Sequence, residues 1–220
     1  MQSAKALTAE TRTNNLLATM GLKVDETVSR AIVGLLRSDS HVVAGVLESS
    51  VAIQELELKL DKTVFTALEQ GGLSPSEIHR VNSAVVISKD LSQLGKLAAN
   101  LGHKVTEVGK HDEKEDFFRL QPLAIAVSHL CRQTLRSLAR LDPVLARNAA
   151  EGGSSVDAYR NYVLRGLSGQ KSPVTGEQNH LIFASRCLEQ LADKAIQLAG
   201  NLVAFLDNQD EPDNSHAMAS

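Results

Sequence analysis

Residues 188–198, LEQLADKAIQL, repeat the apolar pattern of residues 91–101, LSQLGKLAANL, at a constant offset of 97. Four positions hold the same apolar residue in both stretches: Leu91 and Leu188, Leu94 and Leu191, Ala98 and Ala195, Leu101 and Leu198. Their spacing of three and four residues places them on one face of an α-helix. Each stretch therefore predicts an amphipathic helix, and the repetition predicts a duplicated helical unit.

The duplication extends upstream at an offset of 103. The matched pairs are Asp39 and Asp142, Ile53 and Val156, Leu56 and Tyr159, Leu60 and Val163, and Val64 and Leu167. Because the offset falls from 103 to 97, one loop is six residues shorter in the second copy. Two helices and the loop that joins them are therefore duplicated, which predicts two copies of one small helical bundle.

Composition and periodicity agree with an all-α fold. Aromatic residues make up only 3% of the chain and tryptophan is absent, which disfavours a sheet-based core. No stretch alternates apolar and polar residues as a strand does. We predict two tandem antiparallel three-helix bundles, with the first in residues 1–109, a charged linker in 110–116, the second in 117–207 and a disordered tail in 208–220.

Six helical segments are expected, at about residues 8–37, 41–70, 75–108, 117–141, 143–169 and 175–207. Ser74 and Asp142 are predicted to cap helices, since short polar side chains satisfy free backbone N–H groups there, and Asp39 is predicted to be a turn or N-cap residue. Pro122 should mark either the start of the fourth helix or a kink in it. Six leucines are expected in the core: Leu56, Leu60, Leu94, Leu101, Leu191 and Leu198.

Charge and targeting features exclude several classes of protein. A net charge of −3 provides no basic field for nucleic acid, and no run of apolar residues is long enough to span a membrane. The N-terminus lacks the apolar core of a secretion signal. Cys131 and Cys187 have no CxxC partner, so reduced buried thiols and a cytoplasmic location are expected.

One acidic pair has the spacing of a metal site. Glu189 and Asp193 lie four residues apart, so both project from one helix face. Carboxylates at this spacing can hold a hard divalent cation or iron, with Asp157 of the preceding helix as a further ligand. The same spacing also fits a solvated face on which Arg186 forms a surface ion pair with Glu189.

The first copy is basic where the second is acidic. Subtracting 97 places Lys89 at the position of Arg186, Ser92 at that of Glu189 and Lys96 at that of Asp193. Lys89 and Lys96 can contact an anion or an acidic partner surface, or they can simply be solvated. A carboxylate metal site is therefore expected only in the second copy.

Catalytic motifs are missing from the sequence. Glu177 and His180 form one ExxH motif, whereas di-iron bundles need two such motifs and two more glutamates. The chain has no phosphate-binding loop, no dinucleotide fingerprint and no nucleophile elbow. We therefore expect a binding protein and not an enzyme, with a metal-dependent helical-bundle enzyme as the disfavoured alternative.

The duplicated segments resemble those of the PhoU family of phosphate-transport accessory proteins. Residues 90–98, DLSQLGKLA, resemble its D-L-E-R-I-G-D-x-A segment, and residues 188–195, LEQLADKA, resemble its L-E-R-I-A-D-x-A segment. Residues 53–61, IQELELKLD, are similar to I-D-x-L-E-x-x-I-D. Residues 156–159, VDAY, and Arg80 add to the resemblance, which covers about residues 10–207 in the order of the family's two triple-helix repeats.

The resemblance implies a regulator of phosphate uptake and phosphate-regulon signalling. Such a protein would bind a phosphate transporter or a sensor histidine kinase, contact membrane protein complexes peripherally and form a homodimer. An accessory scaffold subunit of a phosphate symporter, without metal, is the alternative. The family's E/D-x-x-x-D metal motif is kept at Glu189 and Asp193, whereas Ser92 and Lys96 replace it in the first copy. The resemblance thus implies one metal site at most.

Overall fold

Seven helices make up the described part of the chain. The computed structural model describes residues 2–37, 39, 41–108, 114–168 and 176–207. The helices are α1 (Gln2–Arg37), α2 (Val46–Glu69), α3 (Pro75–Val108), α4 (Lys114–Arg140), α5 (Pro143–Ala150), α6 (Gly153–Ser168) and α7 (Gly176–Asp207). No strand occurs within these ranges, and the predicted all-α fold is confirmed.

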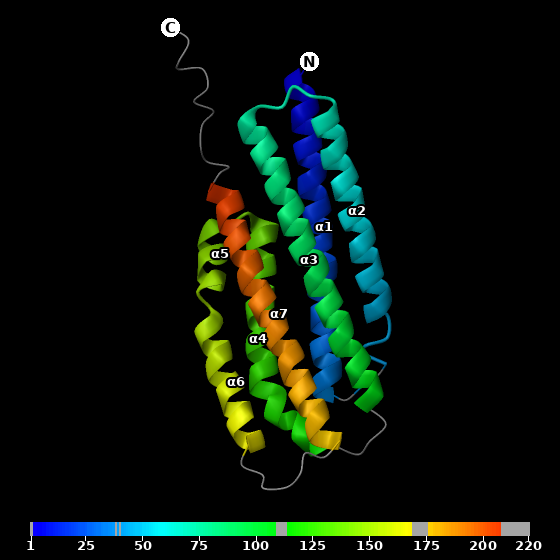
Figure 1. Ribbon diagram of the computed structural model, residues 1–220, viewed down its shortest axis with the longest axis vertical. Helices are drawn as coiled ribbons and strands as arrows, with labels where there is room; N and C mark the ends of the chain where they lie inside the picture. The colour runs from blue at the N-terminus through cyan, green and yellow to red at the C-terminus, as the bar shows by residue number, and fades with distance from the viewer. Residues whose placement is uncertain (1, 38, 40, 109–113, 169–175, 208–220) are drawn as a thin grey trace.

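The helices lie along one long axis (Figure 1). The helices α3 and α7 run antiparallel, side by side, and α1 packs against α4. The first copy is completed by α2 on one side, and the second by α5 and α6 on the other. Four long helices therefore form the centre of the molecule, two from each copy.

The predicted helix boundaries hold with four corrections. The first helix begins at Gln2 and not near residue 8. The fifth segment is two helices, because Glu151 and Gly152 form a turn before Gly153, and paired glycines weaken a helix. The second helix begins at Val46, after a turn in residues 41–45. Pro122 lies inside α4 and does not start it, because the helix already begins at Lys114. Helix α4 therefore includes the last three residues of the predicted linker. Residues 109–113, like the predicted tail 208–220, lie outside the described residues.

The predicted caps at Ser74 and Asp142 are present. The Asp142 carboxylate accepts hydrogen bonds from the backbone N–H groups of Val144 and Leu145, at 2.9 and 3.0 Å. The Ser74 hydroxyl accepts from the N–H of Glu77 at 3.3 Å, and the Glu77 carboxylate accepts from the N–H of Ser74 at 2.7 Å. This reciprocal pair is a capping box, which holds the start of α3. Asp39 does not cap α2, which begins at Val46; it lies in the turn after α1, where it accepts from the N–H of His41 at 2.9 Å.

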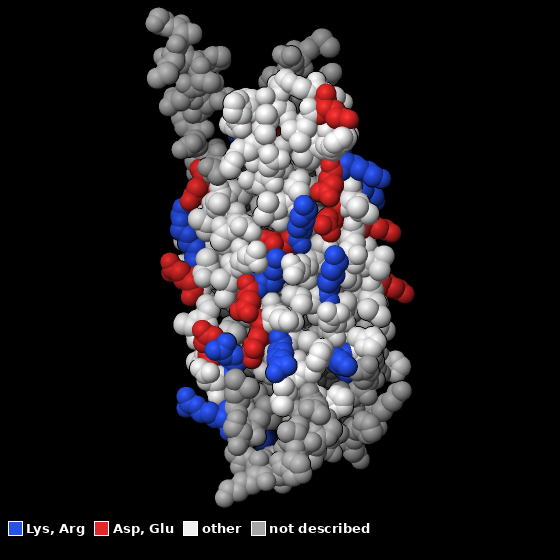
Figure 2. All heavy atoms as spheres, in the orientation of Figure 1, with Lys and Arg blue, Asp and Glu red and all other residues white. Residues whose placement is uncertain are grey.

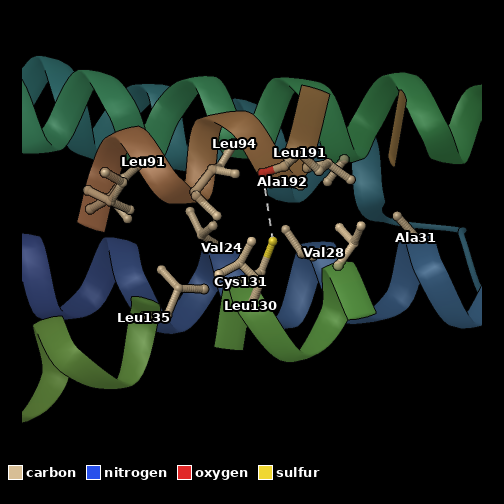
Figure 3. Packing of buried hydrophobic residues seen from close by; sticks show 14 of the residues in the cluster. Val24, Val28, Ala31, Leu91, Leu94, Leu130, Cys131, Leu135, Leu191 and Ala192 are labelled. Atoms are coloured by element: carbon tan, nitrogen blue, oxygen red, sulfur yellow. Dashed lines mark hydrogen bonds between the residues drawn. The ribbon is translucent and has the colours of Figure 1, made fainter. Parts of the chain in front are cut away.

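One hydrophobic core runs through both copies. Five of the six predicted core leucines are fully buried, whereas Leu56 is only partly buried against the core. The 103-residue offset also pairs buried residues of α1 and α4: Leu17 with Leu120, Met20 with Leu123, Val24 with Val127, Ile32 with Leu135 and Leu35 with Leu138. Figure 3 shows side chains of α1, α3, α4 and α7 meeting at the centre, with Leu94 close to Leu191. The two copies therefore share a core.

Candidate functional site

A buried polar cluster joins α3 to α7. The Lys194 ammonium donates to Oδ1 of Asp90 at 2.6 Å, and the Asn201 side-chain amide donates to Oδ2 of the same carboxylate at 2.6 Å. Both members of the ion pair are buried, and Lys194 also donates to Gln197 at 3.3 Å. Because both oxygens of Asp90 are hydrogen-bonded, the charge is compensated inside the core.

This cluster was not predicted from the sequence, although the sequence contains a signal for it. Lys194 lies three residues after Leu191 and four before Leu198, on the apolar face of α7. A charged residue at such a position needs a buried partner of opposite charge. Asp90 likewise interrupts the buried face of α3, between Ile87 and Leu91. Only the tertiary packing shows that the two residues meet.

The predicted acidic residues lie on the surface of α6 and α7. Glu189 is half-buried and accepts a hydrogen bond from the Ser185 hydroxyl at 3.3 Å, and Asp193 is exposed one turn later. Asp157 is exposed on α6 and pairs with Arg160 of its own helix at 3.4 Å. Within the described residues, no three His, Cys, Asp or Glu side chains gather closely enough to hold a metal ion. The residues present therefore do not form a closed cation site, and metal binding stays a prediction.

The equivalent face of α3 carries two basic residues. Lys89 and Lys96 are exposed, whereas Ser92 between them is buried and its hydroxyl has no hydrogen-bond partner among the described atoms. The offset of 97 also pairs exposed positions of the two helices, such as Val86 with Phe183. Figure 2 shows basic and acidic side chains interspersed on this side of the molecule. The two copies thus share a surface pattern but differ in its charge.

A groove lies between α4 and α6 in the second copy, with a volume of about 660 Å³. No Asp, Glu, Lys or Arg lines the groove. The lining residues are Gln121, Pro122, Ile125, Ala126, His129, Leu130, Gln133, Gly152, Ser155, Val156 and Tyr159. Ile125 and Tyr159 are 55% and 42% exposed. Sequence reasoning gave no sign of this groove, because it arises from the break between α5 and α6.

The two cysteines are buried free thiols, as the sequence predicts. Burial raises the pKa of Cys131 to about 12, with a further upward contribution from Asp25. Burial also raises the pKa of Cys187 to about 11, against a downward effect of Lys104. Both thiols are therefore neutral near pH 7, which does not suit a nucleophile. The ExxH motif of Glu177 and His180 lies partly outside the described side chains.

Comparisons with known proteins cover nearly the whole chain. It is 23% identical over 187 residues to a phosphate-specific transport system accessory protein PhoU homolog of Zymomonas mobilis, covering 84% of this chain and 79% of that protein. A PhoU homolog of Xylella fastidiosa is 22% identical, with 79% and 73% covered. Among solved structures, PhoU from Pseudomonas aeruginosa matches with a TM-score of 0.83 and 21% identity, covering 91% of this chain and 98% of that one.

The chain is similar to PhoU proteins in sequence and in fold. PhoU from Streptococcus pneumoniae has the same fold, with a TM-score of 0.77 and 17% identity over 93% of this chain and 97% of that one. No family model matches the sequence. Among the described residues, no helix is both long and apolar enough to cross a membrane.

Proposed function

We propose that this chain regulates phosphate uptake and phosphate-regulon signalling by binding a phosphate transporter or a sensor histidine kinase. One observation carries the proposal: the match to accessory proteins of phosphate-specific transport extends over most of both chains. The shared fold supports the proposal, because this chain matches 98% of the solved PhoU chain from Pseudomonas aeruginosa with a TM-score of 0.83. The protein would act in the cytoplasm, at the inner face of membrane complexes.

The protein would control its partner by binding to it and not by catalysing a reaction. Both cysteines are held neutral by burial, and α3 and α7 expose a long, mostly polar face to a partner. Lys89 and Lys96 on this face would contact an anion or acidic groups of the partner. We therefore propose a regulator without catalytic activity.

Deletion of the gene tests the proposal. Loss of the protein should change phosphate uptake and the expression of a phosphate-regulated reporter in high phosphate, and the wild-type gene should restore both. Purified protein should also bind the purified transporter or the kinase cytoplasmic region in a titration. Unchanged uptake and reporter activity in the deletion strain, together with no binding to either partner, would contradict the proposal.

An accessory subunit of a phosphate symporter, acting without metal, is the second candidate. It is favoured by Ser92 and Lys96, which stand in the first copy where the family motif has acids. Binding to a purified symporter and not to the transporter or kinase would support this candidate.

A single weak cation site at Glu189 and Asp193 belongs to the first candidate. We expect exchangeable binding, because two carboxylates on a solvated face leave most of the coordination to water and the third predicted ligand, Asp157, is paired with Arg160. Calorimetric titration with Mg²⁺, Mn²⁺ and Fe²⁺ should give a signal that Glu189→Gln/Asp193→Asn removes. Identical isotherms for the two proteins would leave this pair as an ordinary solvated face.

A further inference from the structure

The two copies differ most in how their outer helices cover the inner ones. In the first copy, α2 is one unbroken helix with five buried residues, including Ile53, Leu60 and Val64. In the second copy the outer layer is split at Glu151 and Gly152, and the buried apolar residues of α6 within the described side chains are Val156 and Val163. A groove opens beside α6 as a result, along α4.

The charge of the exposed face differs in the same place. At an offset of 103, Lys23, Glu26 and Arg30 of α1 correspond to Ala126, His129 and Gln133 of α4. Glu26 and Arg30 form an exposed ion pair at 2.6 Å, as expected of a solvated helix face. The three residues of α4 carry no Asp, Glu, Lys or Arg side chain, and all three line the groove. At these three positions the second copy lacks the charged side chains that suit a face exposed to water.

Aromatic and aliphatic side chains are exposed to solvent at the groove. Tyr159 corresponds to Leu56, which packs against the core, yet Tyr159 is 42% exposed. Ile125 is 55% exposed on the opposite wall, and Tyr162 is 66% exposed one turn beyond Tyr159. Tyrosine enrichment and depletion of charge are typical of the buried centre of a protein interface.

The geometry of the groove selects the form of its occupant. Its α4 wall runs from Gln121 to Gln133, which at 1.5 Å per residue is about 18 Å, or more than three helical turns. Both walls are helices, whose backbone groups are hydrogen-bonded within each helix. An extended segment would therefore find no strand edge and would bury unpaired backbone groups, whereas a helix satisfies its own. The groove lining contains no Asp, Glu, Lys or Arg. A charged side chain on the buried face of the occupant would therefore find no partner of opposite charge.

We propose that the groove between α4 and α6 is the docking site for an amphipathic helix of the partner protein, with an uncharged apolar face. This inference rests on the proposed function, in which the chain acts by binding another protein. The partner helix would place apolar residues at positions i, i+3, i+4 and i+7 against Ile125, Ala126 and Tyr159. It would complete the outer layer that the break between α5 and α6 leaves open.

A matched pair of variants tests the groove in the full chain. Ala126→Lys/His129→Glu/Gln133→Arg installs on α4 the charged residues that α1 already carries at the equivalent positions. The control is Leu22→Asp, because Leu22 corresponds to Ile125 and is 71% exposed on α1. Circular dichroism and thermal unfolding should show both variants folded, since all the changed positions are at least partly exposed.

The first measurement uses a capped helical peptide of about 14 residues, with leucine and alanine on one face and glutamine elsewhere. Methyl NMR should show shifts at Ile125 and Val156, and the triple variant should weaken binding by about tenfold or more, because the inserted charges would be desolvated. Leu22→Asp should bind as wild type does. A second peptide, with lysine in its apolar face, should bind more weakly. Shifts confined to other residues, equal loss in Leu22→Asp, or equal binding of the lysine peptide would overturn the proposal.

The second measurement uses the purified transporter and the kinase region. If wild type binds one of them and the triple variant binds it equally well, the groove is refuted and the proposed function stands. If wild type binds neither but the peptide binds in the groove, the proposed function fails and the docking site stands. Sedimentation of wild type as a dimer that the triple variant abolishes would show a second copy of this chain as the occupant, which would also refute the proposal.

Discussion

The two ends of the contact between α3 and α7 correspond under the 97-residue offset but differ in chemistry. Asp90 corresponds to Cys187, Lys194 to Leu97 and Asn201 to Lys104. One end holds the buried ion pair with its amide donor. At the other, burial keeps the Cys187 thiol neutral, and Lys104 lies 4.9 Å from the centre of the Phe183 ring.

Because α3 and α7 run antiparallel, these ends lie on either side of the central leucines, Leu94 and Leu191. The duplication therefore kept the apolar positions, while the polar positions diverged. Only one end offers Asp90 a cation and an amide, so the ion pair favours a single alignment of the two copies. Four predictions test how the two ends of this contact differ and how the two copies differ. They are given from the largest expected effect to the smallest.

Lys194→Met should cost about 3–5 kcal/mol of unfolding free energy, because it leaves the Asp90 carboxylate buried without its cation. Lys104→Met, at the other end, should cost about 1 kcal/mol or less, since a partly exposed cation over a ring contributes little. Urea denaturation measures both. The double variant Asp90→Asn/Lys194→Met should recover most of the loss, and equal costs for the two lysine variants would break the comparison.

Leu94→Ala and Leu191→Ala should each cost about 2–5 kcal/mol, since both side chains are fully buried at equivalent central positions. Similar costs, measured as shifts of the denaturation midpoint, would show that the two copies contribute equally to the shared core. Leu56→Ala should cost less, because Leu56 is only partly buried. An unchanged midpoint in Leu191→Ala would contradict the assignment of the apolar face of α7.

The thiols should make stability depend on alkaline pH. In the folded state the pKa values of Cys131 and Cys187 are raised by burial, to about 12 and about 11, from an ordinary thiol value of 9.0. The stabilisation is therefore complete below pH 9 and is lost as the pH rises toward the folded values, at about 1.4 kcal/mol per pH unit for each thiol.

The urea midpoint of wild type should accordingly fall more steeply between pH 8 and pH 10 than that of Cys131→Ala/Cys187→Ala, in which neither thiol can ionise. Comparison with this variant removes the contribution of lysine and tyrosine titration. Parallel pH profiles for the two proteins would contradict the raised pKa values.

Two glycines should respond in opposite directions to alanine. Gly200→Ala should stabilise the protein by about 0.5–1 kcal/mol, since nothing lies within 4 Å of the added Cβ and alanine favours the helix. Gly95→Ala should destabilise it by about 1 kcal/mol, because its Cβ would lie 2.9 Å from Cδ1 of the buried Ile53. The position equivalent to Gly95 in the second copy already holds Ala192. Thermal unfolding measures both changes, and stabilisation by Gly95→Ala would show that Ile53 yields at no cost.

The apolar pattern and the caps could be predicted because they depend on neighbours along one helix. Side chains within a few residues of each other determine three of these features: the apolar face of α7, the Asp142 cap and the start of α3 at Pro75. The break between α5 and α6 was missed, since the apolar period continues through Gly152 and Gly153 from Val144 to Val163. Periodicity therefore predicted one helix, and the paired glycines were given too little weight.

By itself the sequence determined the fold class, the duplication, the family resemblance and most core leucines, because each of these is written in residue spacing along the chain. Only the tertiary structure decided which polar residues are buried and which surfaces are open. Asp90 and Lys194 are 104 positions apart, and the walls of the groove belong to two separate helices. Spacing within a helix sets which face a residue occupies, but the packing of helices against each other sets what that face meets.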